Sequence, residues 1–280
     1  GTSAPELAVC IKAALEGRSG LAVGNVVGSN IFNVLGILGV TALAAPVVVH
    51  RQLTRIDLPV MVLASVVLVV MSVNGRITRL DGLILFSGLV AYTAFIIRSG
   101  RREARDVHSQ MAEVAVDRTE RAGRKPLTNV AIVVLGLTGL ILGADWLVQA
   151  CVALARSLRV SELVIGLTIV AVGTSLPELA TSVLAGRAGR RDIAVGNIVG
   201  SNTFNILSII GLSAMIHPLE VAPQAVQRDM PVMLVAAIAC IPIFLTGRRV
   251  SRLEGALFVG AYAAYAAYLI WQSGPAGNAP

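Results

Sequence analysis

Long stretches without any charged residue set the strongest limit on how this chain folds. Seven segments contain no Asp, Glu, Lys or Arg, namely 19–50, 58–75, 126–144, 163–177, 193–219, 230–247 and 255–280. A helix needs about 20 mostly apolar residues to cross a bilayer. Charged residues make up 14% of the chain, against about 25% in soluble domains. The sequence therefore predicts a helical protein that crosses the lipid bilayer several times.

The net charge of +7 does not indicate a nucleic-acid-binding protein. The cations lie in short connections between apolar segments, as cytoplasmic membrane loops carry them, and aromatic residues make up only 4% of the chain. Cys10, Cys151 and Cys240 lie far apart, so neither a disulfide framework nor a zinc knuckle is expected. The sequence contains no nucleophile–base pair, phosphate loop or cofactor motif. We therefore expect neither an enzyme nor a bound cofactor.

The chain contains an internal repeat with an offset of 172 residues. Residues 1–46 and 173–218 align without a gap and are identical at 25 of 46 positions. Both segments contain Gly-Thr-Ser-x-Pro-Glu-Leu, followed by Ala-Val-Gly-Asn-x-Val-Gly-Ser-Asn-x-Phe-Asn. A weaker match follows, in which Asp57 is aligned with Asp229. Two homologous halves are therefore expected.

The two repeats begin unequally. The second has about 46 residues, 127–172, before its Gly-Thr-Ser motif, and the first has none. We expect the complete protein to carry a further helix and a half before Gly1, and the chain as written not to transport. Each half would then have five spans. Because five is an odd number, the second half would enter the membrane from the opposite side. The sequence thus predicts an all-α integral membrane protein with an inverted-topology repeat of five helices, ten in the full protein. Many secondary transporters have this architecture.

Eight full spans and one short segment are expected. The short segment is 1–16, and the spans are 20–46, 57–75, 81–98, 127–152, 161–186, 192–217, 229–247 and 254–272. A polar connector, 99–126, separates the first half, 1–98, from the second, 127–280. With this connector in the cytoplasm, 16 Lys and Arg residues lie inside and seven outside. Because cytoplasmic loops carry the excess of cations, we predict a cytoplasmic connector and an external C-terminus.

Each repeat places a glutamate in an apolar span, Glu6 in the first and Glu178 in the second. An acid within a membrane span is costly and points to function. Pro5 and Pro177 precede these acids, and proline interrupts a helix and frees backbone carbonyls. Irregular backbone at this depth is tolerated only where it is buried in protein or lines a wet cavity. We therefore expect broken helices with an ion site.

The candidate ligands around the two acids all carry oxygen. The acids share a helix face with the hydroxyls three to four residues earlier, and the second helix of each motif presents a serine and an asparagine spaced four apart. The candidates are Thr2, Ser3, Glu6, Ser29 and Asn33 in the first repeat, and Ala171 through its carbonyl, Thr174, Ser175, Glu178, Ser201 and Asn205 in the second. Hard cations such as calcium and sodium prefer such ligands. Two carboxylates neutralise one calcium or two sodium ions, and protons compete with these ions for the site.

Other polar and small residues in the spans have structural interpretations. Four glycines are expected to pack helices closely, namely Gly24, Gly28, Gly196 and Gly200. Four amides fit helix packing and ion binding equally, namely Asn25, Asn30, Asn197 and Asn202. Asp145 is expected near the outer membrane interface beside Trp146, about 27 Å along its helix from Leu127.

The paired motifs resemble the alpha repeats of the calcium/cation antiporter superfamily, the sodium/calcium exchanger family, over essentially the whole chain. The resemblance implies ten helices in two inverted halves and ion ligands at the candidate positions given above. It also implies that the first and sixth helices slide over the rest. The chain departs from well-known members, which tend to carry Asp where it has Asn205. Some bacterial relatives are similar in having Asn in both repeats, and we expect a bacterial plasma-membrane location.

The resemblance implies secondary active exchange of calcium for sodium. Proton-driven calcium exchange at the same two glutamates remains an alternative, because both mechanisms need paired acids. A cation channel and an inactive structural fragment are further alternatives, although duplicated inverted halves favour alternating access. The expected partners are calcium, sodium or protons and the bilayer, and the sequence does not indicate an oligomeric state.

Overall fold

The structure of the chain is a computed structural model. It describes residues 1–49, 53–111, 134–136, 138–139, 142, 146, 149, 153, 157, 161–245 and 249–273. Most of the predicted span 127–152, including Asp145, and residues 112–126 of the connector lie outside the described residues.

Helices dominate the first half. They are α1 (Ala4–Leu15), α2 (Ser19–Ile31), the π-helical η1 (Phe32–Leu38), α3 (Gly39–Ala44), the π-helical η2 (Leu53–Asp57), α4 (Leu58–Ser72) and α5 (Arg79–Met111). Helix α1 lies within the predicted segment 1–16. Ser3 is its N-cap residue, and Pro5 lies in its first turn, where proline is tolerated. Helix α5 continues 13 residues past the predicted end of its span at residue 98. The residues after Gly100 include Arg, Glu, Ala and Gln, which favour helix, so the connector begins as helix.

The second half repeats this order. Its helical segments are α7 (Glu162–Ile165), η3 (Gly166–Val170), α8 (Ala171–Thr174), α9 (Leu176–Arg187), α10 (Arg191–Phe204), η4 (Asn205–Ile210), α11 (Gly211–Ile216), η5 (Ala225–Asp229), α12 (Met230–Leu245) and α13 (Arg252–Ser273). Element by element, α1 to α4 correspond to α9 to α12 at the sequence offset of 172. Even the turn glycines match, since Gly17 and Gly189 both have positive φ, 70° and 76°.

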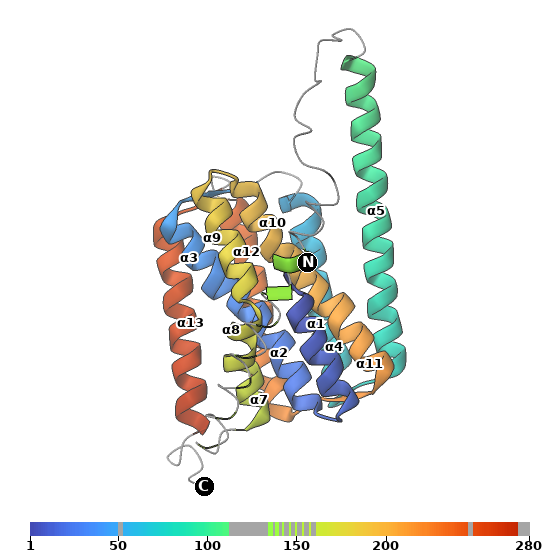
Figure 1. The fold of residues 1–280 in the computed structure, drawn as a ribbon, viewed down its shortest axis with the longest axis vertical. Coiled ribbons are helices and arrows are strands. Elements are labelled where there is room, and N and C mark those ends of the chain that lie inside the picture. The colour runs from blue at the N-terminus through green and yellow to red at the C-terminus, as the bar shows by residue number, and fades with distance from the viewer. Residues whose placement is uncertain are drawn as a thin grey trace.

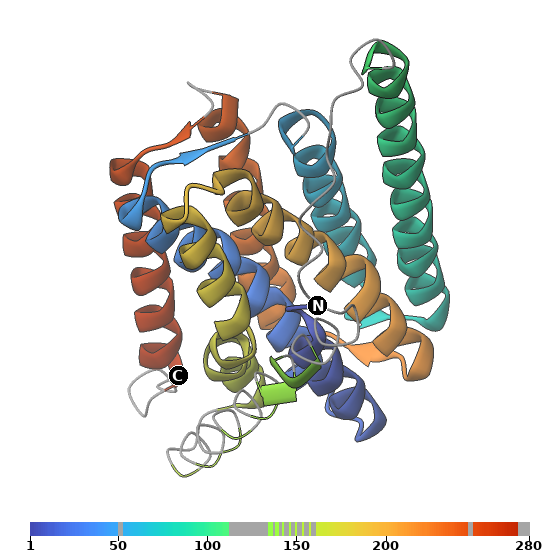
Figure 2. The ribbon, with the colours of Figure 1, turned by 45° about the horizontal axis from the view of Figure 1, so that its top comes forward.

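Two short antiparallel strand pairs join the halves at opposite ends of the bundle (Figure 2). Strand β1 (Val47–Val48) pairs with β4 (Arg249–Val250), and β2 (Arg76–Ile77) pairs with β3 (Leu219–Glu220). The span containing α4 separates β1 from β2, so the repeat mates β1 and β3 lie at opposite ends. In Figure 1, α2 and α3 accordingly rise to the upper left, while α10 and α11 descend to the lower right. This is the arrangement expected of halves that run in opposite directions.

Within the described residues, six helices are long and apolar enough to cross a membrane, and a bent pair makes a seventh. They are Ser19–Ala44, Leu53–Ser72, Arg79–Arg98, Ile193–Ile216, Ala225–Leu245 and Arg252–Gln272, with the bent pair Glu162–Thr174 and Leu176–Arg187. Seven of the eight predicted spans are therefore confirmed, and the eighth lies outside the described residues. The chain is an integral membrane protein.

The two repeat helices that carry the motifs form the centre of the bundle. In the span Ser19–Ala44, 89% of the apolar stretch is buried inside the protein, against 11% in Arg79–Arg98 and 17% in Arg252–Gln272. Helices α5 and α13 therefore form the outer, apolar surface. The inner span packs closely because a Cβ on Gly28 would lie 2.4 Å from the Leu167 carbonyl oxygen. The predicted packing role is confirmed for Gly24 and Gly28, whereas a Cβ on Gly200 would meet no atom within 4 Å.

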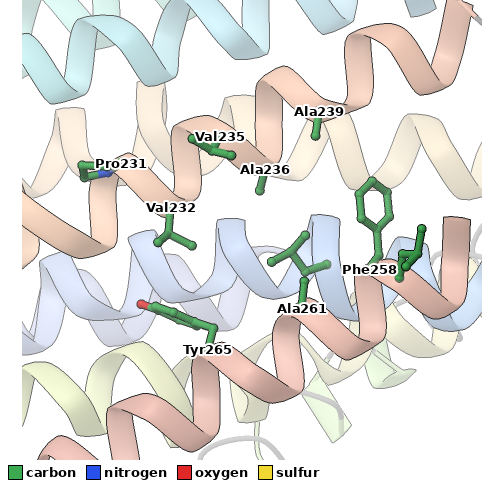
Figure 3. A pocket seen from close by; sticks show the side chains of 10 residues that line it. Pro231, Val232, Val235, Ala236, Ala239, Phe258, Ala261 and Tyr265 are labelled. Atoms are coloured by element: carbon green, nitrogen blue, oxygen red, sulfur yellow. The ribbon is translucent and has the colours of Figure 1, made fainter.

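Two apolar grooves on the outer surface are also repeat mates. One, of about 570 Å³, lies between α12 and α13 over Leu35, with Tyr265 at one side (Figure 3). The other, of about 400 Å³, lies between α4 and α5 over Leu207, with Tyr92 in its wall. Both tyrosines hydrogen-bond to an aspartate at the start of the neighbouring helix, Tyr92 to Asp57 and Tyr265 to Asp229. The repeat therefore extends to the outer helices.

Candidate cation site

Glu6 lies in the first turn of α1, and Glu178 lies in the first turn of α9, directly after the break in the second repeat. The helix axis bends by 45° between the segment that ends at Thr174 and the one that begins at Leu176. Side chains Glu6 and Glu178 are 0% and 1% exposed. Both acids are therefore fully removed from the surface, as the sequence predicts, and the broken helix of the second repeat is confirmed.

Each glutamate is bound by a serine from the other repeat. Ser175 Oγ donates to Glu6 Oε1 at 2.8 Å, and Ser3 Oγ donates to Glu178 Oε1 at 2.8 Å. Ser201 contacts the pair formed by Ser3 and Glu178, because its Oγ lies 3.4 Å from Glu178 Oε1 and 3.1 Å from Ser3 Oγ. The structure thus joins two predicted ligand sets into one site between the halves.

The second carboxylate oxygen of each glutamate has no partner. Glu6 Oε2 and Glu178 Oε2 are buried without a hydrogen bond, and the ion pairs found among the described residues involve neither acid. A buried carboxylate oxygen without a partner is costly. These two atoms are therefore free to bind a cation.

Two amides in the motif-bearing spans have a bonded nitrogen and an oxygen without a described partner. Asn33 Nδ2 donates to Asn202 Oδ1 at 2.9 Å, and Asn205 Nδ2 donates to Asn30 Oδ1 at 3.0 Å. The remaining atoms, Asn33 Oδ1 and Asn205 Oδ1, are buried and have no partner. Because the nitrogen of each amide is engaged and the oxygen is not, both side chains are arranged as acceptors.

The other predicted ligands make further contacts between the two repeats. Ser29 Oγ lies 3.5 Å from the Ala171 carbonyl oxygen, and Thr174 Oγ1 lies 3.2 Å from Asn25 Oδ1. The Ala171 carbonyl still accepts the backbone N–H of Ser175 at 3.1 Å, so the helix break does not leave it wholly free. Thr2 lies at the edge of the site and donates to Asn197 Oδ1 at 3.3 Å.

A cavity of about 260 Å³ adjoins the site on the side of the second repeat. Its lining includes Thr2, Ser3, Asn197 and Ser201. Three of these are predicted ligands, and Ser3 and Ser201 also contact Glu178. The cavity therefore reaches the hydroxyls that surround this acid.

Sequence reasoning did not single out one pair of side chains that support the site. Asn25 Nδ2 donates to Cys10 Sγ at 3.2 Å, and Asn197 Nδ2 donates to Ser182 Oγ at 3.2 Å. Cys10 and Ser182 are repeat mates, so the alignment contained the signal. The change of residue type conceals that both accept a bond from the same asparagine position.

The donor set fits a hard cation. Among the predicted ligands, the four unpartnered atoms are oxygens from two carboxylates and two amides. The described residues contain two further buried unpartnered atoms, the hydroxyl oxygens of Thr41 and Ser213, which lie outside the predicted ligand set. No group of three or more His, Cys, Asp or Glu that could hold a metal occurs in the part of the chain that the structure describes. Oxygen-only sites of this kind suit calcium and sodium better than zinc or copper.

Comparison with known proteins extends over nearly the whole chain. The chain is 40% identical over 278 residues to the inner membrane protein YrbG of Escherichia coli, covering 98% of the chain and 84% of YrbG. It is 32% identical over 302 residues to the sodium/calcium exchanger MaX1 of Methanosarcina acetivorans, covering 97% of the chain and 86% of MaX1. The solved structure of the sodium-calcium exchanger NCX_Mj soaked with 10 mM Na⁺ and 10 mM Sr²⁺ matches with a TM-score of 0.74 at 26% identity, covering 95% of the chain and 82% of NCX_Mj.

The family comparison agrees with these relatives. Residues 1–98 and 128–271 match the sodium/calcium exchanger protein family, and the unmatched residues between them include the whole polar connector. Both motif-bearing repeats fall within the matched residues. The chain therefore belongs to the sodium/calcium exchanger protein family.

Proposed function

We propose that the protein is a secondary active antiporter that exchanges calcium for sodium by alternating access. The observation that carries the proposal is the set of four buried, unpartnered oxygens, Glu6 Oε2, Glu178 Oε2, Asn33 Oδ1 and Asn205 Oδ1. Buried acceptors without donors are stabilised when a cation binds. Membership of the exchanger family supports the antiport mechanism.

The cation is cargo, and the proposed ligands are those predicted from the sequence. They are Thr2, Ser3, Glu6, Ser29, Asn33, Ala171, Thr174, Ser175, Glu178, Ser201 and Asn205. Two glutamates give the site a charge of −2 when ionised, which one calcium or two sodium ions neutralise. Calcium takes six to eight oxygen ligands, so these residues are sufficient without histidine or cysteine.

Proton-driven calcium exchange is the second candidate. It is supported by the hydrogen bonds that serine hydroxyls donate to one oxygen of each carboxylate, Ser175 to Glu6 and both Ser3 and Ser201 to Glu178. The other oxygen of each carboxylate has no partner among the described residues. A carboxyl group in that environment accepts a proton when no metal ion is present. The same two glutamates would then carry either calcium or protons.

Oppositely directed halves support alternating access rather than a channel. The ligand clusters contain residues from both repeats, so movement of one half against the other changes which side reaches the site. We propose that the end of the bundle with β1, β4 and the start of α10 faces the cytoplasm. Of the 16 cations assigned to the inside, seven lie in the connector 99–126 and five at 187–191 and 248–249.

Calcium flux into sealed proteoliposomes that contain the complete gene product tests the proposal. An outward sodium gradient is imposed first, then an outward proton gradient, with radioactive calcium outside. Sodium-driven uptake that Glu178→Gln abolishes is the expected result, because the variant removes one of the two charges that balance calcium. Glu16→Gln is the matched control, since Glu16 lies at the exposed end of α1 in an ion pair with Arg18.

The gradients separate the candidate functions. Uptake driven only by protons would keep the site and favour the second candidate. Equal calcium flux without any gradient coupling would indicate a channel. If neither gradient drives uptake although the protein is folded, calcium exchange is the wrong function for this chain.

A further inference from the structure

Four asparagines form a closed set of hydrogen bonds where the two repeats meet. Asn30 Nδ2 donates to the Asn202 carbonyl oxygen at 3.4 Å, and Asn202 Nδ2 donates to the Asn30 carbonyl oxygen at 3.2 Å. Each then accepts from the ligand amide of the opposite repeat, Asn202 Oδ1 from Asn33 and Asn30 Oδ1 from Asn205. All four side chains are at most 3% exposed. Solvent therefore does not compete for these bonds.

We infer that Asn30 and Asn202 are positioning residues that orient the ion-binding amides of Asn205 and Asn33. This inference rests on the proposed function, because it assigns these two amides as cation ligands. The distinction between the two kinds of asparagine is geometric. The side-chain oxygens of Asn30 and Asn202 are occupied by N–H donors, whereas those of Asn33 and Asn205 have no partner.

Orientation matters because an amide has two ends of similar shape and opposite polarity. The oxygen accepts and the NH₂ group donates. If the amide of Asn33 rotated by half a turn, its N–H groups would face the cation and repel it. In a buried site the two orientations are distinguished by the hydrogen bonds that each makes. Asn202 Oδ1 accepts from Asn33 Nδ2 and therefore holds the oxygen of Asn33 toward the cation.

The backbone bonds of the positioning residues complete this arrangement. Because Nδ2 of Asn202 is bound to the Asn30 carbonyl oxygen, Asn202 cannot turn its own amide without losing a buried bond. The same holds for Asn30 in the other direction. Each ligand amide is thus oriented by the opposite repeat, so the coordination geometry depends on contact between the halves.

A double-mutant cycle in the purified protein tests the inference. Asn202→Leu removes the acceptor for Asn33, and we expect calcium binding measured by calorimetry to weaken about 10- to 100-fold, as when metal-ligand supports are lost. In the Asn33→Asp background, Asn202→Leu should change affinity by less than about threefold, because a carboxylate presents an oxygen in either orientation. Thr203→Val is the matched control. Thr203 is the next residue in the same helix, and its Oγ1 bonds only to the carbonyl oxygen of Val199 among the described contacts.

The mirror cycle, Asn30→Leu with Asn205→Asp, should give the same pattern. Equal losses of affinity in both backgrounds would overturn the inference. The loss of a purely structural asparagine would weaken binding whichever residue occupies the ligand position. Unfolding temperatures in ion-free buffer are measured for the same variants. One outcome is that the wild-type protein binds no cation while the unfolding temperatures of the variants are still non-additive. In that case the proposed function has failed, and the asparagines serve packing alone. If wild type binds calcium but the affinities are additive, only the positioning inference has failed.

Discussion

Within the described residues, Glu6 and Glu178 form no ion pair, unlike another buried acid of this chain, Asp229. Asp229 is also 0% exposed, but Arg228 lies 2.6 Å away and Tyr265 donates to it at 2.9 Å. Removing charge from water is costly unless the charge is paired and hydrogen-bonded. Asp229 satisfies this requirement within the protein, whereas the two glutamates leave it to a bound ion or proton.

Acidification is expected to weaken calcium binding. A protonated carboxyl group is neutral, so calcium must displace each proton held by Glu6 or Glu178 before it binds. Mass action then lowers the apparent affinity by about tenfold per pH unit for each displaced proton. Calorimetry in buffers of successively lower pH measures this slope and the protons released. An affinity that does not change with pH would contradict ligation by these carboxylates.

The sequence places the candidate ligands on their helices, but it does not predict how their side chains pair. Motif identity and helical spacing place Ser3 near Glu6 and Ser175 near Glu178 on their own helices. The structure instead pairs Ser3 with Glu178 and Ser175 with Glu6. This exchange depends on how α1 and α9 approach each other across the repeat interface. Spacing within one helix contains no information on that approach.

At the scale of elements, Gly28 marks a close contact between α2 and the segments η3 and α8. Gly28→Ala would place a Cβ 2.4 Å from the Leu167 carbonyl oxygen and 2.8 Å from the Ala171 Cβ. We expect a loss of about 1–3 kcal/mol in the free energy of unfolding, the usual cost of overpacking. The matched control is Gly260 in the outer helix α13, where an added Cβ would meet no described atom within 4 Å. Gly260→Ala should be neutral or slightly stabilising, because alanine favours helix.

Thermal unfolding of the two glycine variants in detergent measures this difference. Calcium binding is recorded in parallel, since Gly28 directly precedes the proposed ligand Ser29. Equal destabilisation by both substitutions would show that an added methyl group lowers stability irrespective of a helix contact. The present packing of α2 against η3 would then not explain the effect of Gly28.

The outer helices are joined to their neighbours by matched tyrosine–aspartate bonds. Tyr265→Phe leaves the fully buried Asp229 without one donor, and we expect the free energy of unfolding to fall by about 1–3 kcal/mol. Tyr92→Phe removes the corresponding bond to the partly exposed Asp57, where water replaces the donor. Its cost should be smaller, and unfolding of both variants under the same conditions checks the order. A larger effect of Tyr92→Phe would contradict this account.

Span positions follow from the sequence because the cost of burying charge in lipid fixes where each apolar helix starts and stops. The expected spans agree with the structure to within a few residues, as 20–46 does with Ser19–Ala44. The π-helical segments η1 and η4 and the strand pairs could not be predicted in this way. A π-helical turn differs from an α-helical turn by one residue and has no distinct apolar pattern. Two-residue strands depend on a partner from the other half.

At the scale of the whole molecule, the offset of 172 residues relates elements that lie at opposite ends of the bundle. The turn between α1 and α2 contains Glu16, and its repeat mate between α9 and α10 contains Ala188. Both residues are exposed. In halves that run in opposite directions, these turns must lie on opposite sides of the membrane. The cation bias predicts that the arginine-rich turn at 187–191 lies in the cytoplasm.

Single cysteines at these two mated turns test the orientation directly. The three native cysteines are first replaced by alanine, and Glu16→Cys or Ala188→Cys is then introduced. We expect a membrane-impermeant maleimide to label Glu16→Cys only in right-side-out vesicles and Ala188→Cys only in inside-out vesicles. Labelling of both from one side would contradict the inverted arrangement. Labelling from opposite sides but in the reverse sense would support inverted halves and place the connector outside the cytoplasm. The reason is that α5 leads into the connector at the end of the bundle that also holds the turn between α9 and α10 (Figure 1).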